Sequence, residues 1–135
     1  MGAWGTGIFD NDTAADFGHT IADGGGIRAI EDALDTVLAS GGEYLEASAA
    51  EEALAAADAI ARMKGNGSGP SAYSEALDAW IQTNRPSASD ALLTKARSAV
   101  ERVLSEPSEL VEVWQESDEF PAWKSSVETL LRQLG

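Results

Sequence analysis

Residues 4–17 of this 135-residue chain read WGTGIFDNDTAADF, a segment that combines glycines, large aromatic side chains and helix-capping residues. Trp4 and Phe9 are apolar side chains of the kind that anchors a loop in a hydrophobic core. Gly5 and Gly7 allow a positive φ or a close approach of the backbone to a neighbour. We therefore expect an ordered N-terminal loop whose aromatic residues belong to the core.

A helix is expected to follow this loop. Asn11 or Asp12 can accept hydrogen bonds from the free backbone amides of a helix that begins near Thr13. Asp12 and Asp16 place negative charge near the positive N-terminal end of that helix. Phe17 lies on the opposite, apolar side, so the helix is amphipathic.

The opening residues carry a resemblance to a known family. The matching positions are Trp4, Gly5, Thr6, Gly7, Phe9, Asn11, Asp12, Ala14, Asp16 and Phe17. They resemble the opening of the small bacterial proteins collected as domain-of-unknown-function family 4259. The likeness continues more loosely to the C-terminal end of the chain. The resemblance supports the fold prediction for this chain, and it implies no activity because none is established for the family.

Helical periodicity organises the rest of the chain. Apolar residues recur at spacings of three and four within residues 27–38, 45–63, 73–81, 92–104, 110–114 and 120–134. Glycines or prolines stand at or near the breaks, and no segment alternates in the manner of a strand. We predict one all-α domain over residues 1–135 with about six to seven helices, in which a loop at 65–71 separates two helical halves.

The C-terminal half contains a weak internal similarity. Residues 74–80, SEALDAW, resemble residues 108–114, SELVEVW, at an offset of 34. A longer predicted helix follows each of these segments. Two related helical hairpins are therefore one arrangement to expect in this half of the chain.

The balance of charge excludes several classes of partner. The chain has 23 acidic and 9 basic residues, which gives a net charge of −14 at pH 7. A protein with this negative charge repels nucleic acid and anionic membranes. The charge is compatible with a role in solubility or with binding to a basic protein. The chain has no cysteine, which excludes disulfides and thiolate metal sites. Because no long apolar run or secretory signal is present, we expect a cytoplasmic protein. Because of its negative charge, we expect it to bind neither nucleic acid nor a membrane.

One group of side chains near the N-terminus has ligand chemistry. Its members, spaced by four, three and four residues, are Asp12, Asp16, His19 and Asp23. This spacing places them on one side of a single helix, where carboxylates and an imidazole suit a divalent ion. Asp10 can add a further oxygen from the loop. We favour the structural interpretation that this side is the solvated face of an amphipathic helix.

No catalytic signature is present. The chain has one histidine and no cysteine, and it lacks the serine-nucleophile and phosphate-binding glycine motifs. We therefore expect no catalytic residue and no bound cofactor.

Three functional hypotheses remain. The favoured one is a non-enzymatic acidic module that binds a basic protein, for example as an immunity or antitoxin-like factor. The contact residues we prefer for it are Glu46, Glu51 and Glu52, and the rival set is Glu109, Glu112 and Glu116. The second hypothesis is a metal-binding protein or metal-dependent hydrolase that uses the residues from Asp12 to Asp23. The third is a helical cavity that binds a small apolar ligand between Trp80, Trp114 and Trp123.

Overall fold

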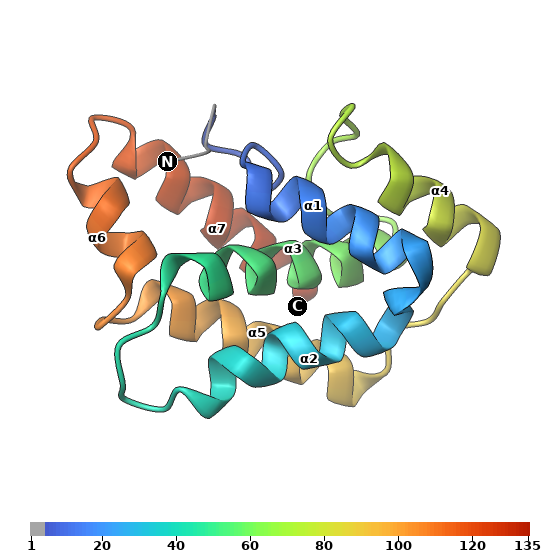
Figure 1. The fold of residues 1–135 in the computed structure, drawn as a ribbon, viewed down its shortest axis with the longest axis horizontal. Coiled ribbons are helices and arrows are strands. Elements are labelled where there is room, and N and C mark those ends of the chain that lie inside the picture. The colour runs from blue at the N-terminus through green and yellow to red at the C-terminus, as the bar shows by residue number, and fades with distance from the viewer. Residues whose placement is uncertain (1–4) are drawn as a thin grey trace.

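The structure of the protein, a computed structural model, describes residues 5–135, which form seven α-helices (Figure 1). The helices are α1 (Asp12–Thr20), α2 (Gly26–Ala39), α3 (Ala47–Met63), α4 (Glu75–Asn84), α5 (Asp90–Leu104), α6 (Glu109–Gln115) and α7 (Phe120–Leu134). The all-α prediction is confirmed. No helix in this part of the chain is long and apolar enough to cross a membrane. The expected anchoring role of Trp4 falls outside the described residues.

Helix α3 runs through the middle of the molecule and is its most buried element (Figure 1). Every residue from Ala53 to Ala61 is buried, including the carboxylate-bearing Asp58. Helices α1, α2, α5 and α7 all pack against α3. A helix that is buried on all sides has apolar residues all round its axis, as the buried part of α3 does. The small alanine side chains of α3 let the neighbouring helices approach it closely.

One hydrophobic core spans the loop at residues 65–71. The buried cluster takes Leu34 and Ile60 from before the loop and Val100 and Leu130 from after it. The indole rings of Trp114 and Trp123 stack at one end of this core, with ring centroids 5.9 Å apart and an angle of 9° between their planes. The two helical halves therefore share one packed interior.

The N-terminal loop packs into that core. Ile8 and Phe9 are both buried. The carboxylate of Asp10 folds back and accepts a 3.0 Å hydrogen bond from the backbone N–H of Gly7. A Cβ atom at Gly5 or Gly7 would lie only 2.5 or 2.8 Å from Asp10 Oδ2. The glycines leave room for this close approach, and a side chain at either position would require the Asp10 carboxylate to shift.

Helix α1 begins as a capped helix. The side chain of Asn11 accepts a 2.8 Å hydrogen bond from the backbone N–H of Ala14, which makes Asn11 the N-cap. Ala14 and Phe17 are buried, and Ile21 beyond the helix continues the same apolar side. This confirms the predicted amphipathic face.

Helices α1 and α2 are joined by a kinked segment, Ile21–Gly25, in place of a regular helical turn. Gly24 has a φ of 120° and Gly26 a φ of 56°, values that side-chain-bearing residues rarely adopt. A Cβ atom at Gly25 would lie 2.7 Å from the carbonyl oxygen of Thr20. The glycine run therefore redirects the chain so that α1 and α2 both reach α3.

The expected pair of hairpins in the C-terminal half is wrong for α4 and α5. Helix α4 packs on α1, α3 and the Ile21–Gly25 segment, whereas α5 lies against α2, α3 and α7. Leu77 of α4 is fully buried, and its Cβ lies 3.8 Å from the place a Cβ would occupy at Gly18 of α1. The apolar face of α4 is thus buried against α1 and not against α5.

Candidate functional site

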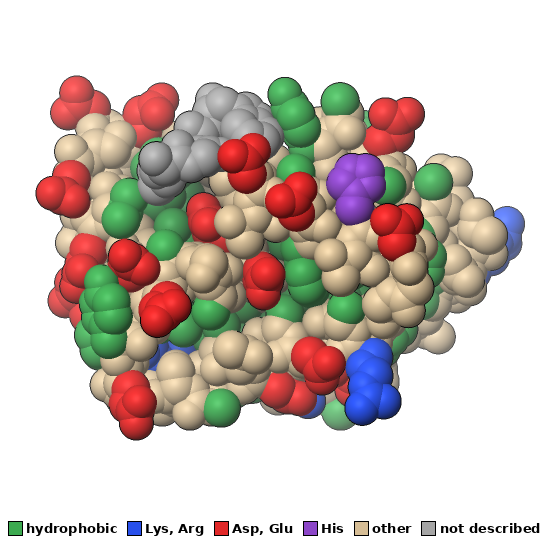
Figure 2. All heavy atoms as spheres, viewed as in Figure 1, with side chains coloured by type: hydrophobic (Ala, Val, Ile, Leu, Met, Phe, Trp, Pro, Cys, Tyr) green, Lys and Arg blue, Asp and Glu red, His purple; other side chains and the backbone are tan. Residues whose placement is uncertain are grey.

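The structure separates the four residues that the sequence suggests as metal ligands. Asp12, Asp16 and His19 are exposed on α1, and His19 is visible at the surface in Figure 2. Asp23 lies beyond the helix in the kinked segment, with φ −92° and ψ 23°. The expectation of one continuous helix is therefore wrong. Within residues 5–135, no three histidine, aspartate or glutamate side chains gather in a way that would hold a metal ion.

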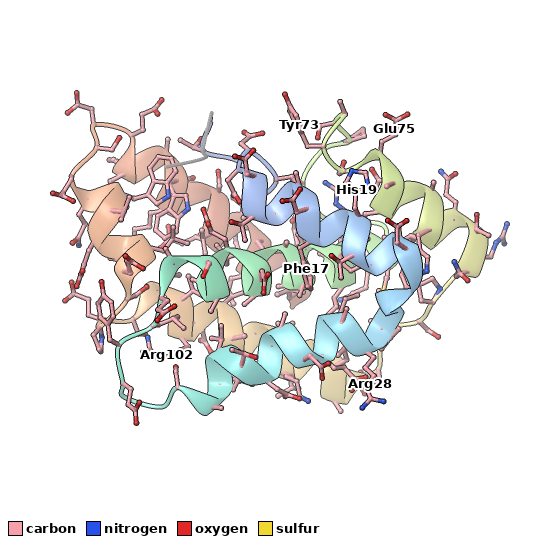
Figure 3. All side chains as sticks on the ribbon, viewed as in Figure 1. Phe17, His19, Arg28, Tyr73, Glu75 and Arg102 are labelled. Atoms are coloured by element: carbon pink, nitrogen blue, oxygen red, sulfur yellow. The ribbon has the colours of Figure 1, made fainter. Side chains whose placement is uncertain are left out.

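The space beside Trp114 and Trp123 bears on the third hypothesis, a small apolar ligand bound between the tryptophans. Next to Trp114 and Trp123 the structure leaves a cavity of about 10 Å³, which has room for about one water molecule. Trp80 lies elsewhere, with its Cζ2 atom 3.6 Å from the place a Cβ would occupy at Gly26. The stacked rings fill the core at this place, and Figure 3 shows side chains occupying the spaces between the ribbons.

The starts of α3 and α6 lie side by side. The backbone N–H of Leu45 donates to the carbonyl of Pro107 at 3.1 Å, and the N–H of Glu109 donates back to the carbonyl of Leu45 at 2.9 Å. The Glu109 side chain then accepts a 2.8 Å hydrogen bond from the backbone N–H of Ala47. A carboxylate from α6 thereby caps the first turn of α3, where negative charge is stabilising.

This contact joins the two glutamate groups that the sequence presents as alternatives. We call the joint surface the acidic end, and it consists of Glu46, Glu51, Glu109, Glu112 and Glu116. Glu52 lies apart from it and lines a pocket with Thr20 of α1 and Asp32 of α2. In Figure 2, acidic side chains lie over α6, the turn that follows it and the start of α3, at the left of the view, and others are spread over the rest of this face. The salt bridges in residues 5–135 are Arg62–Asp58, Arg62–Asp78 and Lys95–Asp35. Within the described part of the chain, the carboxylates of the acidic end thus form no salt bridge.

An exposed tyrosine stands within the acidic end. The side-chain hydroxyl of Tyr44 donates a 2.9 Å hydrogen bond to Glu112 Oε1. Partial desolvation, this hydrogen bond and the negative charges of Glu112, Glu109 and Glu46 raise the pKa of Tyr44 to about 12. Three carboxylates of this surface therefore lie near one phenol.

Arg102 of α5 holds the loop that carries this surface. Its guanidinium donates to the backbone carbonyls of Gly41 at 2.9 Å, Glu43 at 2.6 Å, Ser105 at 2.7 Å and Pro107 at 3.1 Å. Figure 3 labels this side chain at the same end of the molecule as the loop between α2 and α3. The role of Arg102 was not predictable from the sequence, because no local spacing links an arginine on one helix to two distant loops.

Glu51 is a half-buried member of the acidic end. Burial raises its pKa, the hydrogen bond with Thr13 opposes that rise, and the nearby charges of Asp12 and Glu109 add to it. Glu51 is half-buried, whereas Glu46 is exposed. Glu51 therefore belongs to the support of the surface more than to its contact area.

A second polar cluster, around Arg62, is committed to holding the fold. Arg62 pairs with the buried Asp58 through a 2.8 Å contact and with Asp78 through a 2.7 Å contact. Its guanidinium also donates to the Ser68 hydroxyl at 2.8 Å, and the Ser68 backbone N–H donates to Asp58 Oδ1 at 2.9 Å. Burial alone lowers the pKa of Arg62, but the two carboxylates outweigh burial and raise it. The cluster ties the loop at 65–71 to α3.

Asp58 also lines a surface pocket of about 200 Å³. The other polar side chains around this pocket include Ser125, Thr129 and Gln133 of α7. Both oxygens of Asp58 already accept hydrogen bonds, from Arg62 and from Ser68. The carboxylate therefore serves the Arg62 cluster. An aspartate four residues before an arginine on an alanine-rich helix is the sequence signal that was missed.

Comparison with known proteins gives a family and no activity. The family model described as "Domain of unknown function (DUF4259)" matches residues 2–126. Neither the curated proteins nor the solved structures yielded a match. Because the family model covers nearly the whole chain, the protein belongs to the family described as Domain of unknown function (DUF4259).

Proposed function

We propose that this protein is a non-enzymatic binding module whose acidic end docks a basic protein partner. The observation that carries the proposal is the meeting of Glu46, which precedes α3, with Glu109 and Glu112 of α6 around Tyr44, with none of them in a salt bridge within residues 5–135. A surface that concentrates one sign of charge attracts a partner of the opposite sign and repels other polyanions. Neutralisation of a cationic toxin, as an immunity or antitoxin-like factor does, is the specific form of this role that we propose.

The glutamates of the acidic end have different tasks in this proposal. Glu46, Glu112 and Glu116 are exposed, so their charges act on the approach of a partner and on the rim of the contact. Glu109 caps α3, and Glu51 is half-buried beside Thr13. A substitution of Glu109 would therefore remove the cap of α3, and a substitution of Glu51 would change the stability of the protein as well as its charge.

The test uses two variants with the same change of net charge. The acidic-end variant carries Glu46→Gln, Glu112→Gln and Glu116→Gln, so that the amide oxygen at position 112 can still accept the Tyr44 hydrogen bond. The matched control carries Asp16→Asn, Asp23→Asn and Glu75→Gln, three exposed positions outside the acidic end. Each variant removes three negative charges.

The three forms are immobilised and exposed to native lysate at low and at high salt. We expect the wild type and the matched control to retain a basic protein at low salt, and the acidic-end variant to lose it. High salt should release it from all forms, because screening weakens attraction between exposed charges. Equal retention by both variants, or recovery of nucleic acid or of an acidic protein indifferent to salt, would contradict the proposal.

A further inference from the structure

We propose that Tyr44 is an arginine-selective anchor at the centre of the acidic end, so that the partner contacts it through an arginine side chain. This inference rests on the proposed docking function and names the chemical group that the surface recognises. It is carried by the exposure of the ring, by its carboxylate neighbours and by the rigidity of its loop.

Tyr44 is the most exposed large hydrophobic side chain in residues 5–135. Its exposed fraction is 52 %, compared with 45 % for Tyr73 and 36 % for Leu38, the other large hydrophobic side chains exposed in residues 5–135. Hydration of an exposed aromatic ring is unfavourable. Tyrosine is one of the residues enriched among those that contribute most to binding energy at protein interfaces. Tyrosine also loses little side-chain entropy when a partner immobilises it.

The surroundings of the ring select a cation. The hydroxyl of Tyr44 holds the Glu112 carboxylate at 2.9 Å, and the charges of Glu46 and Glu109 act on the same phenol. A planar guanidinium stacks on an aromatic face and at the same time offers paired N–H donors to a neighbouring carboxylate. The ammonium group of lysine is a compact, strongly hydrated charge that does not combine these two contacts. An aromatic face beside a carboxylate therefore favours arginine over lysine.

The backbone on both sides of Tyr44 is fixed. The carbonyl of Glu43 accepts a 2.6 Å hydrogen bond from Arg102, and Leu45 exchanges hydrogen bonds with Pro107 and Glu109. The ring is thus presented from a pinned loop and does not have to be ordered when the partner binds. Preorganisation of this kind increases affinity because less conformational entropy is lost on binding.

The probes are two peptides that differ only in their cations, acetyl-GRGRG-amide and acetyl-GKGKG-amide. Each is titrated into the full chain, and binding is followed by the NMR shifts of the Tyr44 ring and of the backbone amides of the acidic end. We expect the arginine peptide to bind about two- to fivefold more tightly, the range for a cation stacked on an exposed ring. Tyr44→Ala should make the two peptides equal, whereas Tyr73→Ala, which removes the other tyrosine, should keep the preference.

Equal affinities in the wild type, or an arginine preference that survives Tyr44→Ala, would overturn the inference. If both peptides bind the acidic end equally, attraction by charge stands and only the arginine anchor fails. If neither peptide shifts the resonances of the acidic end, the inference and the proposed docking surface are both contradicted.

Discussion

Replacement of Arg62 by methionine should strongly destabilise the protein. The side chain of Asp58 is fully buried, and that of Arg62 is 6 % exposed. Removal of the guanidinium leaves the Asp58 carboxylate inside the protein with hydrogen bonds only from Ser68. Methionine keeps an apolar side chain of comparable length, so the loss reports mainly on charge and hydrogen bonding and less on a cavity.

The expected loss for Arg62→Met is about 3–5 kcal/mol, the range for breaking a buried ion pair by removing one partner. This is a large part of the roughly 5–15 kcal/mol that stabilises a typical domain. The double variant Asp58→Asn/Arg62→Met should be more stable than Arg62→Met alone, since it no longer buries an uncompensated charge. The control is Lys95→Met, which breaks the exposed 2.8 Å pair with Asp35 and should cost less than about 1 kcal/mol.

The assay is equilibrium unfolding in urea, followed by far-ultraviolet circular dichroism at neutral pH. A loss below about 1 kcal/mol for Arg62→Met would show that Asp58 is solvated or repartnered in the variant. A double variant as unstable as the sum of the two single variants would also refute the reasoning, because the two side chains would then be energetically independent.

Three further predictions concern single positions. Gly25→Ala should cost about 1–3 kcal/mol in urea unfolding because its Cβ would lie 2.7 Å from a backbone oxygen, whereas Gly42→Ala, with no atom within 4 Å, should change stability by less than about 0.5 kcal/mol. Glu51→Gln should stabilise the protein at pH 7 and not at about pH 3. Because the pKa of Glu51 is raised, the wild type loses stability as this carboxyl ionises with rising pH. An equal difference in unfolding free energy between variant and wild type at both pH values would refute this prediction. The phenol of Tyr44 should ionise at about pH 12 in an ultraviolet titration assigned with Tyr44→Phe, and Glu112→Gln should lower that value, because one neighbouring charge is removed.

The helices were predictable because their signals are local. The apolar spacing over residues 27–38 predicts a helix that the structure places at Gly26–Ala39, and the run that begins at Leu45 corresponds to Ala47–Met63. In each case the pattern ends near glycines, which terminate helices through backbone preferences of a few neighbouring residues.

The failures were long-range or conformational. The spacing from Asp12 to Asp23 assumes one regular helix, but the regular helix ends at Thr20 and Asp23 lies in the wider, kinked segment Ile21–Gly25. The acidic end depends on contacts between segments about 60 residues apart, such as Ala47 with Glu109, which no local period records. The sequence indicated the glutamates as two alternative groups, but it did not indicate that residues of both groups lie around Tyr44.

The most direct test of the docking surface is the association rate of the captured basic partner at increasing ionic strength. It is measured for the wild type, the acidic-end variant and the matched control. We expect the rate for the wild type and the control to fall steeply with salt while dissociation changes little. The acidic-end variant should associate more slowly at low salt and show a flatter dependence. Identical salt dependence in the two triple variants would contradict the claim that the acidic end is where the partner docks.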